Sequence, residues 1–198
     1  MTREILLVPH ANRQQNLEAT SRAAELLQDP GITVRVCADE KVLPGLKHVP
    51  HTEDAAAGCE LVLVLGGDGT FLRAADMARA VDIPVLGINL GHVGFLAEWE
   101  VESLDQALVR VIEKRYRIED RLTIDVSIFD EEGTLLNRSW ALNEASVENQ
   151  NRSGVLDAIL EVDRRPVSSF GCDGVLISTP TGSTAYAFSA GGPAVSYT

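Results

Sequence analysis

The sequence predicts an α/β N-terminal domain with an open, mostly parallel sheet, followed by an all-β domain. Short apolar runs alternate with helix-like stretches up to about residue 115, a pattern typical of parallel sheets covered by helices. From Tyr116 the period changes to alternating apolar and polar residues, which is typical of antiparallel strands. We therefore place the domain boundary near residue 117 and expect domains at 1–117 and 118–198.

The first domain follows from apolar runs and breakers. Five consecutive apolar residues, Leu61 to Leu65, predict a strand buried on both faces, and Pro30-Gly31 ends the first helix. Residues 39–58 contain the breakers Pro44-Gly45 and Pro50 and are expected to be irregular. The expected elements are strands at 5–8, 33–37, 61–65 and 84–89, and helices at 14–27, 70–80 and 103–115.

The second domain follows from alternation. Leu122, Ile124, Val126 and Ile128 alternate with polar residues, so one face of this strand is expected to be buried. Turn residues at 130–133 and 163–166 predict hairpins. The remaining expected strands are 134–140, 158–162, 167–170 and 175–177.

Composition narrows the class of partner. The formal charge of −12 argues against nucleic acid and anionic membranes, which both attract basic surfaces. A small anionic ligand remains possible if local cations offset the repulsion, and Mg²⁺ is the simplest such cation. The three cysteines show no C-x-x-C spacing and no apolar run reaches 18 residues, so we expect a cytoplasmic protein without disulfides or zinc.

The loop Gly66 to Gly69 joins the buried strand to the next helix. Its glycines let backbone N–H groups approach a phosphate and permit positive φ. Asp68 is the one ionisable residue of this loop, and a carboxylate beside phosphates has a chemical use if it holds Mg²⁺ or removes a proton. Asp-Gly is also an ordinary turn, so a structural role stays open. Arg73 is a candidate phosphate contact or a surface arginine.

A second glycine-bearing loop, Asn89 to Phe95, follows the neighbouring strand. Open α/β sheets bind ligands at the carboxyl ends of their strands, so both loops are expected to face one crevice. His92 is a candidate proton carrier and Phe95 a candidate stacking residue, although core packing explains either one.

Three stretches of the β-rich half suggest binding. Adjacent Asn143 and Glu144 can grip two ribose hydroxyls, and Asp173 places one carboxylate in a turn. Six hydroxyl-bearing side chains occur between Ser178 and Tyr186, which suits sugar and phosphate oxygens. A polar surface loop is the alternative.

Together these motifs resemble the bacterial NAD kinase family. The P-loop, protein-kinase, G-x-S-x-G and H-E-x-x-H signatures are all absent. The resemblance spans residues 61–193 and rests on four ordered segments: Gly66-Gly67-Asp68-Gly69-Thr70, Asn89-Leu90-Gly91 with Gly94-Phe95-Leu96, Asn143-Glu144, and Asp173-Gly174 with Ser178 to Tyr186 and Gly191-Gly192.

The resemblance implies transfer of the γ-phosphoryl of ATP, with Mg²⁺ held through substrate phosphates, to the 2′-hydroxyl of the adenosine ribose of NAD. It implies that Asp68 is the general base, that Asn143 and Glu144 hold ribose, and that Asp173 meets the nicotinamide end. Gly69 and Phe95 would line the adenosine site. The glycine loop itself, independently of the resemblance, predicts ATP phosphates near Gly66, Gly67, Gly69 and Thr70, with Arg73 as a further candidate that the family pattern does not require. The adenine and its ribose would contact Thr181, Thr184, Ala185, Tyr186 and Ser189. A homo-oligomer, dimer or tetramer, is also implied.

Two departures from the family pattern qualify the resemblance. Gly171 stands where NAD-restricted members carry arginine, which suggests acceptance of NADH as well. Family members also continue past Gly191-Gly192-Pro193, so the all-β domain is expected to be incomplete. Two alternatives stay open: a lipid kinase sharing the glycine-aspartate loop, and a non-catalytic NAD-binding or sensing module.

Overall fold

The computed structural model describes residues 3–10, 14–37, 43, 46–90, 94, 96–97, 99–100, 103–149 and 154–196. The chain forms two compact units, Met1–Glu119 and Asp120–Thr198, which we call the α/β unit and the β unit. Within the described residues, no helix is long and apolar enough to cross a membrane.

The α/β unit contains one six-stranded sheet whose paired strands all run parallel. The predicted fold class is therefore confirmed. The strand order is β3-β2-β1-β4-β5-β6, so the winding direction reverses between β1 and β4. The strands are β1 (Glu4–Pro9), β2 (Thr33–Val36), β3 (Lys47–His48), β4 (Leu61–Leu65), β5 (Val85–Asn89) and β6 (Trp99–Glu100).

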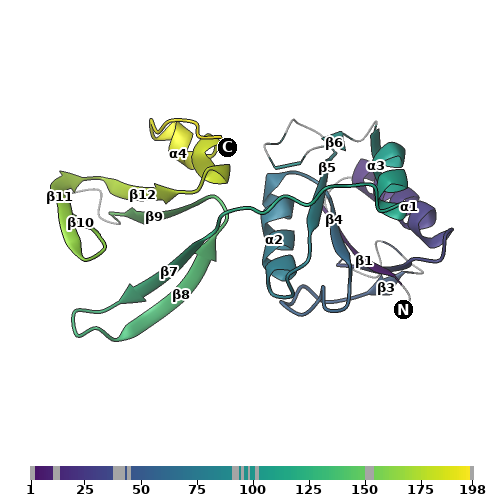
Figure 1. Ribbon diagram of the computed structural model, residues 1–198, viewed down its shortest axis with the longest axis horizontal. Helices are drawn as coiled ribbons and strands as arrows, with labels where there is room; N and C mark the ends of the chain where they lie inside the picture. The colour runs from purple at the N-terminus through teal and green to yellow at the C-terminus, as the bar shows by residue number, and fades with distance from the viewer. Residues whose placement is uncertain are drawn as a thin grey trace. The chain divides into compact units, whose positions relative to one another are not determined.

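Helices cover both faces of this sheet (Figure 1). The helices are α1 (Gln14–Gln28), α2 (Asp68–Arg79) and α3 (Leu104–Ile112). Along β4, Leu61, Leu63 and Leu65 pack in the cluster that includes α1 and α3, whereas Val62 and Val64 pack in the cluster that includes α2. All five residues are nearly inaccessible, which explains the continuous apolar run in the sequence.

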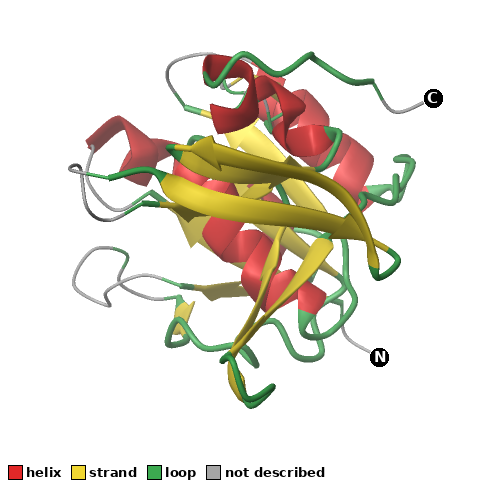
Figure 2. Cartoon of the chain, turned by 90° about the vertical axis from the view of Figure 1, so that its left-hand side faces the viewer, coloured by secondary structure: helices red, strands yellow, loops and turns green. Residues whose placement is uncertain are grey.

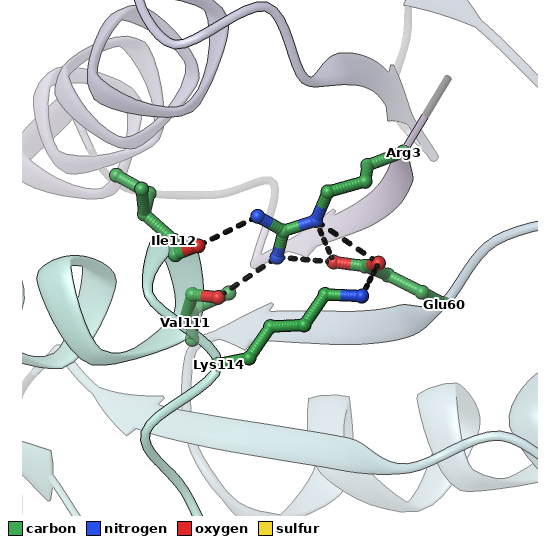
Figure 3. A network of polar contacts seen from close by, with 5 residues as sticks. All are labelled: Arg3, Glu60, Val111, Ile112 and Lys114. Carbon is green, nitrogen blue, oxygen red and sulfur yellow. Dashed lines mark hydrogen bonds and ion pairs between the residues drawn. The ribbon is translucent and has the colours of Figure 1, made fainter. Parts of the chain in front are cut away.

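A polar network fixes the end of α3 (Figure 3). Arg3 donates to Glu60 and also to the carbonyl oxygens of Val111 and Ile112, at 2.9 and 2.6 Å. Burial raises the pKa of Glu60, but hydrogen bonding and charge from Arg3, together with Lys114, outweigh it and lower the pKa overall. The expectation that this helix reaches residue 115 is wrong, because Arg3 caps the carbonyls at Ile112 instead.

Among its described residues, the β unit forms three antiparallel strand pairs, whose strands are labelled in Figure 1; Figure 2 draws all strands of the chain in yellow. Two pairs are hairpins of consecutive strands, and the pair β9–β12 joins segments far apart in sequence, with Glu144 opposite Ser178. The pairs are β7 (Ile124–Phe129) with β8 (Leu135–Ala141), β9 (Glu144–Glu148) with β12 (Gly174–Ser178), and β10 (Leu156–Val162) with β11 (Arg165–Cys172). A 3-10 turn, η2 (Thr181–Thr184), and a short helix, α4 (Tyr186–Ser189), follow.

Candidate active site

The glycine-aspartate turn lies at the carboxyl end of β4, beside the point where the sheet reverses its winding. Helix α2 begins at Asp68 and not at Thr70 as predicted, so the turn itself is only Gly66 and Gly67. The predicted use of positive φ is also wrong, since Gly66, Gly67 and Gly69 are not among the glycines with positive φ. At Gly66 the need is for space, because a Cβ there would lie 2.9 Å from Thr70 Oγ1.

The start of α2 suits an anionic group. The first N–H groups of any α-helix have no partner within the helix, and the N-cap residue Gly67 contributes no side-chain cap. Thr70 is buried, and its Oγ1 has no hydrogen-bond partner among the described residues. Gly69 and Arg73 both lie exposed, one helical turn apart. This end of α2 therefore offers backbone donors and one nearby cation.

Asp68 connects α2 to the loop that follows β5. Its Oδ1 accepts a hydrogen bond from the backbone N–H of Leu96 at 3.1 Å. Gly94 lies against the same carboxylate, since a Cβ on Gly94 would be 2.6 Å from Oδ1. The two glycine-bearing loops therefore lie in contact at these residues. The candidates Phe95 and His92 lie outside the described residues.

A second cluster forms within the β unit, where Thr179 ties two motifs together. Its backbone N–H donates to the carbonyl of Asn143 at 2.8 Å, and its hydroxyl donates to the carbonyl of Leu142. The same hydroxyl accepts from the N–H of Gly182 at 3.0 Å. A Cβ on Gly182 would lie 2.0 Å from the Asn143 carbonyl oxygen, so only glycine allows this approach. The hydroxyl-rich stretch and the Asn143-Glu144 pair are therefore neighbours.

Asn143 and Glu144 present two acceptors without donors. Asn143 Oδ1 and Glu144 Oε2 are both buried and have no hydrogen-bond partner in the described structure. Burial raises the pKa of Glu144. Buried polar atoms are almost always paired in folded proteins, so these two neighbouring acceptors are available to the hydrogen-bond donors of a ligand.

The remaining candidate residues surround this cluster in sequence. Asp173 is exposed at the bend between β11 and β12. Thr181 and Thr184 lie in η2, Ala185 follows it, and α4 carries Tyr186 and Ser189, both exposed. Sequence reasoning missed Thr179 and Gly182 as positioning residues, although both belong to the hydroxyl-rich stretch.

The described residues contain no group of three or more His, Cys, Asp or Glu side chains that could hold a metal ion. Mg²⁺ is commonly held by one or two carboxylates together with substrate phosphates. The donor set around Asp68, one carboxylate beside an anion-binding helix end, fits Mg²⁺ held by a carboxylate together with substrate phosphates.

A parallel sheet with a helix beginning directly after its central strand is characteristic of nucleotide-binding α/β proteins. Comparison with known families defines the class further. Residues 5–116 match the ATP-NAD kinase N-terminal domain, and residues 142–197 match the ATP-NAD kinase C-terminal domain. The chain belongs to the NAD kinase family.

Curated relatives and solved structures agree with this assignment. The NAD kinases of Corynebacterium diphtheriae and Corynebacterium efficiens are 62% and 65% identical over 199 residues, which cover 96% of this chain and 63% of each relative. The chain thus spans less than two thirds of their length.

Two solved structures cover 98% of this chain. Yeast NADH kinase complexed with NADH has a TM-score of 0.86 at 25% identity, with 62% of that chain covered. An NAD kinase from Archaeoglobus fulgidus in complex with ATP has a TM-score of 0.66 at 26% identity, with 67% of that chain covered.

Proposed function

We propose that this protein is an NAD kinase, which transfers the γ-phosphoryl group of ATP to the 2′-hydroxyl of the adenosine ribose of NAD. The 2′-oxygen forms a bond to the γ-phosphorus, the bond from that phosphorus to the ADP oxygen breaks, and the hydroxyl proton leaves to a base. The products are NADP and ADP. The names of the relatives and the ligands of the solved structures support this assignment.

The unpaired acceptors of the β unit are the observation on which the proposal chiefly depends. A vicinal diol donates two hydrogen bonds from adjacent carbons, and adjacent Asn143 Oδ1 and Glu144 Oε2 lack two donors. A ribose of NAD supplies this pair of hydroxyls. A lipid kinase would need an apolar site for its substrate in place of such buried acceptors.

Asp68 is the proposed general base. Its carboxylate is half-buried and held at Oδ1 by the Leu96 N–H, so its position is fixed before substrate arrives. A positioned base contributes about 10²- to 10⁴-fold to such a reaction. Phosphoryl transfer otherwise depends on positioning and on stabilising charge, to which the N–H groups at the start of α2 contribute.

The proposed phosphate site comprises Gly66, Gly67, Gly69, Thr70 and Arg73. Mg²⁺ arriving with ATP would neutralise phosphate charge there, with Asp68 as the neighbouring protein carboxylate. The adenine and its ribose are assigned to Thr181, Thr184, Ala185, Tyr186 and Ser189, the adenosine site also to Gly69 and Phe95, and the nicotinamide end to Asp173.

We further propose a cytoplasmic homo-oligomer. Cys37, Cys59 and Cys172 are free thiols, which suits a reducing compartment. Large apolar side chains such as Phe129 and Leu136 are exposed on the β7–β8 hairpin, and an interface between copies would remove them from water. Light scattering should give a mass of at least two chains, whereas a monomer at micromolar concentration contradicts the oligomer.

The function is tested by a coupled assay for NADP from ATP, Mg²⁺ and NAD. The 198-residue chain is assayed beside a version extended to the length of the relatives. NADP formation supports the proposal. A thermal shift with NAD in both versions, but no NADP in either, indicates a non-catalytic binding or sensing module instead.

A further inference from the structure

Gly94 is in close contact with the carboxylate of Asp68. A Cβ on Gly94 would lie 2.6 Å from Oδ1, 3.4 Å from Cγ and 3.7 Å from Oδ2 of Asp68. Real Cβ atoms are essentially never found closer than 3.0 Å to another heavy atom in this setting. An alanine at this position would therefore move the carboxylate by at least about 0.4 Å.

The backbone of Gly94 does not explain why glycine is needed there. Its φ lies outside the left-handed region, so an alanine would adopt the same backbone without strain. The atoms that exclude a Cβ all belong to Asp68, which is a short side chain on the first residue of α2. The requirement for glycine is therefore room for one carboxylate.

Two groups of the same segment act on one oxygen. The N–H of Leu96 donates to Asp68 Oδ1 at 3.1 Å, and Gly94, which has no side chain, leaves the room that this oxygen occupies. We infer that Gly94 is a positioning residue, which sets the place of the Asp68 carboxylate for proton removal. This inference rests on the proposed function of Asp68.

Gly94→Ala should lower kcat by about 10- to 10²-fold. A misplacement of about 1 Å costs enzymes about 10²-fold, and the displacement of at least about 0.4 Å expected here should cost less than or as much as that. The KM for NAD should change by less than about 3-fold, since the displaced group acts on the proton and not on the ribose acceptors. Gly154→Ala is the matched control. Its nearest neighbour would be Asn149 Nδ2 at 3.9 Å, so kcat should stay within about 2-fold.

Combining Gly94→Ala with Asp68→Asn separates positioning from general damage. Asparagine has nearly the shape of aspartate, so the crowding by an alanine at 94 is the same in both backgrounds. If Gly94 acts through the base, the double variant turns over within about 2-fold of Asp68→Asn alone. If the two losses multiply, Gly94 has an independent role and the inference is overturned.

The Leu96 amide gives a readout that needs no activity. In ¹H–¹⁵N spectra, Gly94→Ala should shift the Leu96 amide proton upfield as its hydrogen bond to Asp68 lengthens, and Gly154→Ala should leave it unchanged. An unmoved Leu96 amide overturns the inference. If the Leu96 amide shifts in Gly94→Ala but the unmodified protein makes no NADP, the contact between Gly94 and Asp68 is supported and the proposed function is contradicted.

Discussion

The hydroxyl of Thr179 should hold the proposed ribose site together, and Thr179→Val tests this. Thr179 is 1% exposed, and valine has nearly the same volume and branching. The change removes the donor to the Leu142 carbonyl and the acceptor for the Gly182 N–H. Packing is conserved, so any loss of stability reports on these hydrogen bonds.

The expected loss follows from the two groups left unpaired. Leaving one buried donor or acceptor unsatisfied costs about 1–3 kcal/mol, and two such groups give about 2–4 kcal/mol after partial relaxation. With a urea slope of about 2 kcal/mol per molar, the unfolding midpoint should fall by about 1–2 M. The backbone bond from Thr179 to Asn143 remains, so the strand pairing of β9 with β12 should persist below the midpoint.

Urea unfolding followed by tryptophan fluorescence measures this loss. The sequence has two tryptophans, Trp99 and Trp140, so Trp99→Phe leaves Trp140 in β8 as the reporter of the β unit. Ser168→Ala is the control, because this serine of β11 is exposed and the loss of its hydroxyl should change the free energy of unfolding by less than about 0.5 kcal/mol. Equal midpoints for Thr179→Val and Ser168→Ala would show that the Thr179 hydroxyl does not stabilise the β unit.

Three further predictions use acid titration and substrate choice. The hydrogen bond and charge of Arg3 lower the pKa of Glu60, so the stabilising contribution of Glu60 is present above its ordinary pKa of 4.5 and is lost as pH falls through the lowered pKa. The free energy of unfolding of Glu60→Gln, measured in urea, should therefore not show this decrease at acid pH. Burial raises the pKa of Glu144, so the effect of Glu144 on stability has the opposite sign: the free energy of unfolding falls as pH rises above 4.5 and through the raised pKa. This decrease should be absent in Glu144→Gln. Gly171→Arg should reduce the kcat/KM for NADH relative to NAD by at least about 10-fold, because it restores the arginine that NAD-restricted members of the family carry at this position; an unchanged ratio contradicts this.

The central strand could be predicted to the residue, whereas the helix ends could not. Leu61 to Leu65 is apolar throughout because both faces of β4 are covered, and this pattern is local. The end of α3 depends on Arg3, which is 109 residues from Ile112 in the sequence. The strands β3 and β6 have two residues each, which is too short to show any periodicity.

The candidate site was predictable in its motifs but not in its supports. Asp68 stands out as the one ionisable residue of a glycine loop, and Asn143 and Glu144 stand out because they interrupt a strand-like pattern. Gly94 and Gly182 do not stand out, since each is needed for room beside a residue far away in the sequence. Gly182 lies against Asn143 and Gly94 against Asp68, and only the folded chain shows these contacts.

The proposed reaction depends on Asp68 removing the proton of the ribose hydroxyl. The decisive measurement is the turnover of ATP and NAD to NADP by Asp68→Asn, together with its NAD affinity by calorimetry. We expect NAD affinity close to that of the unmodified protein and turnover lowered by at least about 10²-fold. Turnover near that of the unmodified protein would contradict it.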